Sequence, residues 1–358
     1  MSEPQIYAVV MAGGSGTRFW PASRAARPKQ YMPISGGRPM LAETLARLEG
    51  LVPNERRLVV TAQSQVDLVR EVAPELDPAN IVAEPMARNT APCVALAARE
   101  VARRDPDAVQ VVLAADHVIE PAESFRETLR AASEVAVRED ALLTLGVKPS
   151  FPATGYGYIE CGASLDPSRG IAVHAVDQFV EKPDEATAAE YVASGRHYWN
   201  AGIFIWSCKA IDAALARHLP AARDGLARLD EGADLTQVYA SLPAEPIDTA
   251  VMEQADNVRM LPIDYEWNDV GSWAALADMA ERVDGNMPAL SGGARLISIG
   301  AQNCLAYAEG EHVIGLVGVE DLVVVSSGNA TLVCPRDKAQ EVKKIVEQLK
   351  HSDGSAFL

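Results

Sequence analysis

The sequence contains no long apolar run. None of its hydrophobic stretches approaches the ~20 residues that a membrane-spanning helix needs. Residues 1–5 lead directly into a strand-like segment, without the basic and apolar parts of a signal peptide. We therefore expect a cytoplasmic protein that does not interact with a membrane.

Paired cysteines are also missing. The five cysteines are scattered, they are odd in number, and no two form a CxxC pair. This arrangement excludes a disulfide framework and a cysteine zinc site, and it favours reduced, mostly buried thiols of a cytoplasmic protein.

The chain has no excess of positive charge, because its formal net charge is −17. A strongly acidic surface disfavours binding to nucleic acid or to an anionic membrane. Acidic residues are absent, however, between residues 4 and 42, where five basic residues lie: Arg18, Arg24, Arg27, Lys29 and Arg38. This basic island suits a small polyanionic ligand, and a solvated basic surface is an equally good interpretation.

The first two-thirds of the chain alternates between short apolar runs and amphipathic segments. We predict strands at residues 6–11, 58–61, 81–83, 109–114 and 142–147, and helices at residues 40–51, 64–73, 91–104 and 122–138. Such alternation predicts an α/β fold with a doubly wound, mostly parallel, Rossmann-like sheet. Ligands of such sheets bind at the carboxyl ends of the strands.

After about residue 285 the pattern changes to short strands without helices between them. We predict strands at residues 295–299, 304–308, 313–317, 322–325 and 331–333, followed by a helix over residues 337–350. No clear repeat defines their geometry. The predicted domains are therefore a catalytic domain over residues 1–285 and a small all-β module with a terminal helix over residues 286–358.

A glycine-rich turn follows the first predicted strand, with Gly13, Gly14 and Gly16 before Thr17. Glycines at this place let backbone N–H groups approach phosphate oxygens, although many such turns carry glycines for tight packing alone. A dinucleotide-binding fingerprint would need a third glycine where Phe19 stands, and a P-loop would need lysine where Thr17 stands. Both familiar phosphate-binding loops are thereby excluded.

The basic residues that follow make the turn more specific. Arg18 and Lys29 could grip a triphosphate from two sides, arginine as a fork and lysine as a point charge. The whole segment, GGSGTRFWPASRAARPKQ, resembles the signature of the sugar-1-phosphate nucleotidylyltransferase family. The resemblance covers nearly the whole chain. It implies that Arg18 and Lys29 are catalytic, that residues 13, 14, 16 and 17 bind the nucleotide, and that the β module is a short left-handed β-helix.

Two aspartates stand where a metal would be useful. Asp116 follows the apolar run that ends at residue 114, and Asp269 lies in the polar and aromatic segment EWNDVGSW. Two carboxylates can hold one Mg²⁺, although a helix cap or a turn residue is the commoner role of an isolated aspartate. The family resemblance implies that both bind Mg²⁺.

Further family motifs indicate a sugar site. FVEKP contains Glu181 and Lys182, NAGIF begins with Asn200, and TGYGY contains Gly155. The resemblance implies that Glu181, Asn200 and Gly155 bind the sugar and that Lys182 is catalytic. Because neighbours in a strand point to opposite faces, Glu181 and Lys182 can share one site only if the chain bends there. A surface ion pair and a tight turn are the alternative interpretations.

The segment EPMARNTAP, with FWP and EWNDVGSW, looks like the mannose-1-phosphate guanylyltransferase branch of the family. Glu84 could accept hydrogen bonds from the two donors on the pairing edge of guanine, or it could be a solvated helix cap. Together with Glu84, Asn89 and Thr90 are predicted to bind the nucleotide.

The resemblance implies transfer of GMP from GTP to mannose 1-phosphate by direct displacement, with release of pyrophosphate. A different nucleotide sugar, an inactive sugar-nucleotide-binding regulator and an NAD-dependent oxidoreductase are the alternatives. We expect a homodimer, because symmetric dimers are common and the family often associates. Some relatives carry a further isomerase domain, and no isomerase activity is expected here.

Overall fold

The computed structural model describes residues 4–14, 16–34, 37–352 and 354–358. The chain divides into two compact units. Unit 1 comprises Met1–Gly13, Leu45–Ala115 and Ile119–Trp267, and unit 2 comprises Gly14–Thr44, Asp116–Val118 and Asn268–Leu358. The basic island therefore belongs to unit 2, although it lies far in sequence from most of that unit. The domain boundary after residue 285 stays a prediction.

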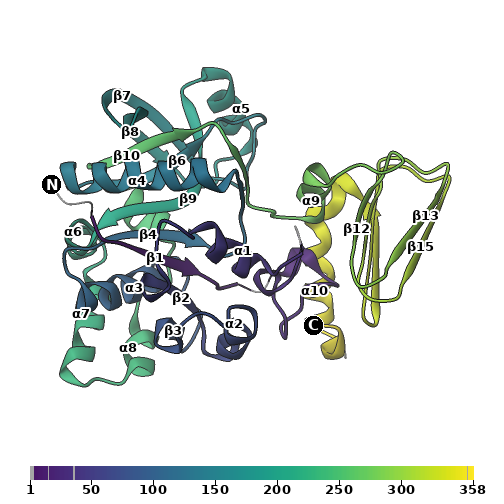
Figure 1. Ribbon diagram of the computed structural model, residues 1–358, viewed down its shortest axis with the longest axis horizontal. Coiled ribbons are helices and arrows are strands. Elements are labelled where there is room, and N and C mark those ends of the chain that lie inside the picture. Colours follow the sequence, from purple (N-terminus) through teal and green to yellow (C-terminus); the bar gives the residue numbers. More distant parts are fainter. Residues whose placement is uncertain (1–3, 15, 35–36, 353) are drawn as a thin grey trace. The chain divides into compact units, whose positions relative to one another are not determined.

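Unit 1 is built on a nine-stranded mixed sheet (Figure 1). In spatial order its strands are β3 (Ile81–Glu84), β2 (Arg57–Ala62), β1 (Ile6–Met11), β4 (Val109–Ala114), β9 (His197–Ser207), β6 (Leu142–Val147), β10 (Val258–Ile263), β8 (Ile171–Val180) and β7 (Tyr158–Ser168). Strands β3, β2, β1 and β4 pair in parallel, as do β6 and β10, whereas β9 runs antiparallel to both of its principal neighbours. The prediction of a mostly parallel α/β sheet is confirmed.

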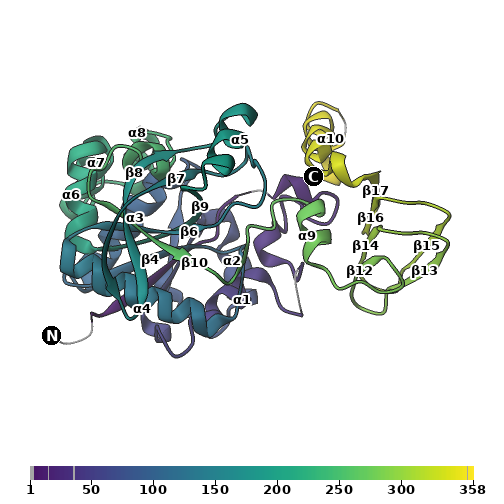
Figure 2. The ribbon, with the colours of Figure 1, turned by 90° about the horizontal axis from the view of Figure 1, so that it is seen from above.

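Helices cover both faces of this sheet. They are α2 (Val66–Val72), α3 (Thr90–Arg104), α4 (Ala122–Glu139), α5 (Glu185–Ser194), α6 (Cys208–His218), α7 (Pro220–Ala227) and α8 (Leu235–Ser241), with a π-helix at Asp248–Met252. Helices α3, α6, α7 and α8 lie on one face and share a core with β1 and β4, whereas α4 lies on the other face (Figure 2). In the described part of the chain, no helix is long and apolar enough to cross a membrane.

The predicted strands of the first half agree with the structure to within one residue. The predicted first helix was too long, because α1 (Met40–Arg47) ends before Gly50, whose φ of +79° cannot continue a right-handed helix. Strands β7 to β10 and helices α5 to α8 had not been predicted.

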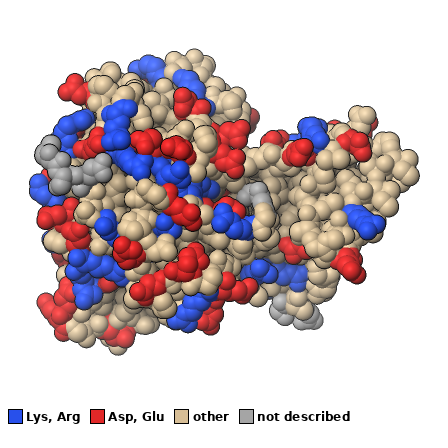
Figure 3. Space-filling model, viewed as in Figure 1, with Lys and Arg blue, Asp and Glu red and all other residues tan. Residues whose placement is uncertain are grey.

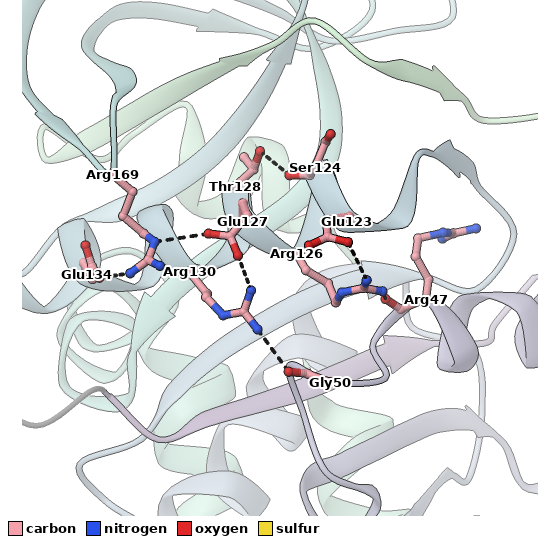
Figure 4. Close-up of polar contacts among 10 residues, drawn as sticks. All are labelled: Arg47, Gly50, Glu123, Ser124, Arg126, Glu127, Thr128, Arg130, Glu134 and Arg169. Carbon is pink, nitrogen blue, oxygen red and sulfur yellow. Dashed lines mark hydrogen bonds and ion pairs between the residues drawn. The ribbon is translucent and has the colours of Figure 1, made fainter.

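The outer side of α4 is linked to its surroundings by ion pairs (Figure 4). Arg130 contacts Glu127 and donates to the Gly50 carbonyl at 3.0 Å, and Arg169, from the turn between β7 and β8, contacts Glu127 at 3.3 Å and Glu134 at 3.0 Å. Exposed pairs of this kind contribute ~0–1 kcal/mol each, so their main effect is to hold local geometry.

Unit 2 contains a β-helix-like stack. Its strands are β12 (Met287–Leu290), β14 (Leu305–Ala308), β16 (Leu322–Ser327) and β17 (Ala330–Pro335) in one sheet, and β13 (Arg295–Ile299) and β15 (Val313–Val317) in another. Met287 pairs with Leu305 and Leu305 with Val323, a step of 18 residues that Arg295 and Val313 repeat. The predicted β module is confirmed, and its repeat lies in the strand spacing. The short strands β5 (Val118–Glu120) and β11 (Glu266–Asn268) form a further pair.

Aromatic residues of the signature segment form much of the core of unit 2. The Phe19 ring lies 4.8 Å from that of Trp273, which begins α9 (Trp273–Met279), and the Trp273 indole donates to the Trp20 carbonyl at 3.1 Å. Helix α10 (Val342–Lys350) packs on the same core through its apolar stripe, with Val342 and Val346 buried. The terminal helix therefore covers the core of its own chain.

Candidate active site

Lys29 is the centre of a polar cluster in unit 2. A turn over Lys29–Tyr31 follows Pro28 and leaves the lysine only 4% exposed. Its ammonium group donates to the Asp116 carboxylate at 3.0 Å, to the Asp116 carbonyl at 3.3 Å and to the Asp269 carbonyl at 2.8 Å. These three acceptors match the three donors of an ammonium group. The structure thus brings the predicted residues Lys29, Asp116 and Asp269 together.

The glycine-rich turn fits closely against this lysine. A Cβ atom on Gly16 would lie 2.8 Å from the Lys29 Cβ and 2.6 Å from the Ser23 hydroxyl, and Gly16 has a φ of +57°. Only glycine satisfies both conditions. Gly13 and Gly14 are exposed with open space around them, Thr17 begins a short helical turn, and the Arg18 side chain is exposed.

Asp116 is held ionised by its neighbours. Burial raises the pKa of this carboxyl, but the charge of Lys29 and, to a smaller degree, His117 outweigh burial, and its pKa lies below the ordinary value. The turn at Asp269 is fixed by Asn268, which accepts from the Val270 N–H at 2.7 Å, and by the Asp269 carboxylate, which accepts from the Gly271 N–H at 3.1 Å.

Carboxylate and carbonyl oxygens around Lys29 are ligands that Mg²⁺ prefers, and such an ion commonly takes only one or two protein carboxylates beside water and phosphate oxygens. Asp116 and Asp269 therefore fit a divalent cation by their chemistry. Among the residues that the structure describes, no three His, Cys, Asp or Glu side chains form a complete metal cage. Any ion here would take its remaining ligands from substrate and water.

A second polar cluster, in unit 1, contains the predicted sugar residues. Strand β8 ends at Val180, and Lys182 takes a φ of +50°, so the chain bends where sequence reasoning required it to bend. The Lys182 ammonium contacts the Glu181 carboxylate. A Cβ on Gly157 would lie 2.6 Å from that carboxylate, so glycine at this position allows it to approach the backbone. Gly155 is exposed and makes no such close approach.

Asn200 lies at an irregularity of β9. The register with β6 pairs Thr144 with Phe204 but Gly146 with Asn200, so β9 carries extra residues between them. Gly202, with a φ of +65°, allows this bulge and donates its N–H to the Asn200 Oδ1 at 3.1 Å. Bulges of this kind re-aim a side chain.

Glu84, a predicted nucleotide-binding residue at the end of β3, is buried in unit 1. Its carboxylate accepts a hydrogen bond from the Tyr239 hydroxyl at 2.5 Å. Burial raises the pKa of this carboxyl, while hydrogen bonds from Tyr239 and Cys93 oppose that shift. A buried, hydrogen-bonded carboxylate is not a solvated cap, so that interpretation of Glu84 is wrong.

Asn89 and Thr90 form the start of α3. The Asn89 side chain caps the helix by accepting from the Thr90 N–H at 2.9 Å, and the Thr90 hydroxyl accepts from the Ile247 N–H at 2.9 Å. The segment that resembles the guanylyltransferase branch thus supports the chain just before the π-helix.

Sequence reasoning missed several residues of these clusters. Asp248 contacts Asn200, Tyr239 contacts Glu84, and Glu253 accepts from the Glu181 N–H at 2.8 Å. All three lie in residues 239–253, where no element had been predicted. An acidic residue at each end of the apolar run DTAVME was the signal that could have indicated them.

Comparison with known proteins identifies the fold's family. Residues 7–285 match the family described as nucleotidyl transferase, and residues 294–349 match a domain described as MannoseP isomerase/GMP-like beta-helix. A solved structure from Thermus thermophilus, named mannose-1-phosphate geranyltransferase, is 38% identical with a TM-score of 0.88, and covers 97% of this chain and 99% of that one.

Curated relatives agree. The mannose-1-phosphate guanylyltransferase ManC of Salmonella typhimurium is 40% identical over 99% of this chain and 75% of its own length, and the xanthan biosynthesis protein XanB of Xanthomonas campestris is 39% identical over 98% and 74%. The resemblance inferred from the signature segment is thereby confirmed. The chain belongs to the nucleotidyl transferase family, among the mannose-1-phosphate guanylyltransferases.

Proposed function

We propose that the protein transfers GMP from GTP to α-D-mannose 1-phosphate and produces GDP-mannose and pyrophosphate. A phosphate oxygen of mannose 1-phosphate attacks the α-phosphorus of GTP in line, and the bond from that phosphorus to the β-phosphate oxygen breaks. The observation that carries this proposal is the joining of Lys29, Asp116 and Asp269 in one cluster, in a chain whose relatives are named for this reaction.

The side chains of this chain would act mainly by position and charge. Arg18 and Lys29 would hold the β- and γ-phosphates as negative charge develops on the leaving pyrophosphate, with residues 13, 14, 16 and 17 as backbone contacts. Lys182 would orient the attacking phosphate, while Gly155, Glu181 and Asn200 would hold the sugar. No general base is needed, because a sugar phosphate is already an anion at pH 7.

Mg²⁺ is the proposed cofactor, and Asp116 and Asp269 are the residues that would hold it. When bound, it would supply positive charge to the phosphate oxygens of GTP. Lys29 has to release at least one of its three acceptors if its ammonium group is also to contact the triphosphate.

Selectivity for guanine is assigned to Glu84, with Asn89 and Thr90 at the start of the same helix. The buried carboxylate supports this assignment, since an acceptor removed from water discriminates strongly between donors and acceptors on a base. Its bond to Tyr239 supports an alternative, in which Glu84 positions the segment that precedes the π-helix. A different nucleotide sugar as product remains the second candidate function.

A cytoplasmic homodimer is proposed as the working form. The β13–β15 sheet carries an exposed apolar surface made by four side chains: Ile297, Ile299, Val313 and Val317. Figure 3 shows many Lys, Arg, Asp and Glu side chains over unit 1 and few on the visible face of the β module. An apolar surface of this kind suits a protein partner, and a second copy is the commonest one.

Pyrophosphate release tests the proposed reaction. The protein would be incubated with each nucleoside triphosphate in combination with mannose, glucose and galactose 1-phosphates, with and without Mg²⁺. We expect fastest release with GTP and mannose 1-phosphate and none after chelation. Faster release with another pair would favour the second candidate, and binding without release for every pair would favour an inactive regulator.

A further inference from the structure

A chain of hydrogen bonds crosses the sugar cluster of unit 1 from one element to the next. The Thr144 hydroxyl, on β6, donates to the Asn200 Oδ1 at 2.7 Å, and the Asn200 Nδ2 donates to the Asp248 carboxylate at 3.0 Å. Asp248 begins the π-helix Asp248–Met252. Such helices are rare and frequently occur at functional sites.

This chain determines which way the Asn200 amide points. The Oδ1 atom accepts from both Thr144 and the Gly202 N–H, so both of its lone pairs are used. The Nδ2 group gives one hydrogen to Asp248, which leaves the other hydrogen for a ligand. An amide in water both donates and accepts, whereas Asn200 in this setting is a donor only.

We propose that Asp248 is a positioning residue of the sugar-phosphate site, which fixes the Asn200 amide as a hydrogen-bond donor toward one hydroxyl of the hexose. The proposal rests on the proposed function, because it assigns the substrate of that site. It predicts that recognition of the sugar depends on a residue that lies outside the family motifs quoted above.

The surroundings of Asp248 fit a group kept for function. Glu181 and Lys182 are the charged groups that act on it, and Glu181 and Asp248 repel each other. Burial and then the Glu181 charge raise the pKa of Asp248 to about 6. Thr144, which begins the chain of bonds, is fully buried. Carboxyls with a perturbed pKa cluster at functional sites, so this shift accords with the hydrogen-bond geometry that carries the proposal.

Isothermal titration with mannose 1-phosphate tests the proposal without turnover. In Asp248→Ala the Asn200 amide loses its partner, and we expect the Kd for mannose 1-phosphate to rise about ten- to hundredfold, the effect of losing a hydrogen bond to a charged group. Asp248→Asn keeps an acceptor oxygen and should recover most of the affinity. The KM for GTP should stay within twofold, which a general loss of structure would not allow.

Two further variants make the test decisive. Thr144→Val removes one donor to Oδ1 at constant shape, so its Kd should rise less than in Asp248→Ala, and it serves if that variant does not fold. Asp256→Ala, an exposed aspartate shortly after the π-helix, is the matched control and should bind as the wild type does.

The outcomes separate this proposal from the proposed function. Unchanged binding in folded Asp248→Ala, in a wild type that forms GDP-mannose, overturns the role of Asp248 alone. Lost binding in that variant, in a wild type that forms no GDP-mannose, supports Asp248 and overturns the proposed reaction. A wild type that does not bind mannose 1-phosphate overturns both.

Discussion

Asp116 in unit 2 and Asp248 in unit 1 are both half-buried carboxyls, and their surroundings shift their pKa values in opposite directions. Asp116 has the Lys29 ammonium at 3.0 Å, and its pKa is below the ordinary value. Asp248 has Glu181 as its strongest charged neighbour, and its pKa is raised to about 6. Burial acts on both in the same direction, so the sign of the neighbouring charge decides the difference.

The two clusters therefore suit different ligands. A carboxylate that is ionised at every physiological pH suits a cation and the phosphates that accompany it. Asp248 acts through the Asn200 amide, whose remaining Nδ2 hydrogen suits a neutral hydroxyl that accepts a hydrogen bond without bringing charge. The two parts of the proposed substrate pair, a triphosphate with its metal and a hexose, differ in the same way.

The largest expected effect tests the proposed cation ligands of unit 2. Asp116→Ala and Asp269→Ala should each lower kcat by about 10²–10³-fold or more, because the phosphates lose a preorganised electrostatic contact. Steady-state pyrophosphate release would measure it. Asp337→Ala, an exposed aspartate of the same unit, is the control and should retain full activity.

Mn²⁺ binding followed by electron paramagnetic resonance would show whether the two aspartates share one ion. Each variant should weaken binding, and the wild type should bind one ion per chain in the presence of GTP. If both single variants bind Mn²⁺ as the wild type does, shared coordination is wrong even where activity is lost.

The next effect concerns the basic island. Arg18→Ala and Lys29→Ala should each lower kcat/KM by about tenfold to a hundredfold, and the double variant by less than the product, because both residues act on the same leaving group. Arg38→Ala tests the alternative of a solvated basic surface, since Arg38 is exposed and paired with Glu43 at 2.9 Å. Equal, small losses in all three single variants would favour that alternative.

The Lys29 cluster could be predicted from sequence much further than the cluster that contains Asp248. Lys29, Asp116 and Asp269 stand in motifs with glycines, prolines and aromatics whose local meaning is clear, and the structure joins them. Asp248 stands in no such motif. Its role depends on the bulge in β9 and on the hydrogen bond that Thr144 donates to Asn200. Pairing between strands that are distant in sequence sets that geometry, and no periodicity of apolar residues indicates it.

A smaller effect tests the Asp248 side through stability. The pKa of this carboxyl is about 6 in the folded protein and about 3.9 in an unfolded chain. Its neutral form is therefore favoured by folding, and the associated stability is present below about pH 4 and lost as pH rises through about 6. Asp248→Asn avoids this loss and should be more stable than the wild type at pH 8, by about 2–3 kcal/mol.

Thermal unfolding at pH 5 and pH 8 would measure it. The Tm of Asp248→Asn should exceed that of the wild type by roughly 3–6 °C at pH 8 and by less at pH 5. Asp256→Asn serves as the control, because Asp256 is exposed and the neighbouring Arg217 lowers its pKa. An Asp248→Asn difference that is the same at both pH values would show that Asp248 does not ionise near pH 6, and the contrast with Asp116 would disappear.

The strands of the fold also differ in how far the sequence predicts them, because some depend on local sequence and others on pairing with distant strands. Strands 6–11 and 109–114 are apolar on both faces and are bounded by turn residues, so their ends were predicted correctly. Strand β7 is partly exposed and has Gly162 and Pro167 within it, and it is stabilised by pairing with β8 and β9. Tertiary pairing outweighs local propensity at such a strand.

The smallest expected effect on activity extends the comparison to the surfaces of the two units. Unit 1 carries the ion pairs of α4, whereas the β13–β15 sheet in unit 2 exposes Ile299 (64%) and Val317 (70%), which face each other across the strands. Lysines at both positions should dissociate a dimer formed by this surface, because burying two unpaired charges per subunit is costly. Light scattering at micromolar concentration should then change from a dimeric to a monomeric mass, with kcat within about twofold of the wild type because every residue assigned to catalysis lies before residue 270.

Val137→Lys, an exposed apolar position on α4, is the matched control and should leave the mass unchanged. A monomeric wild type, or a double variant that remains dimeric, would show that this surface does not join two copies.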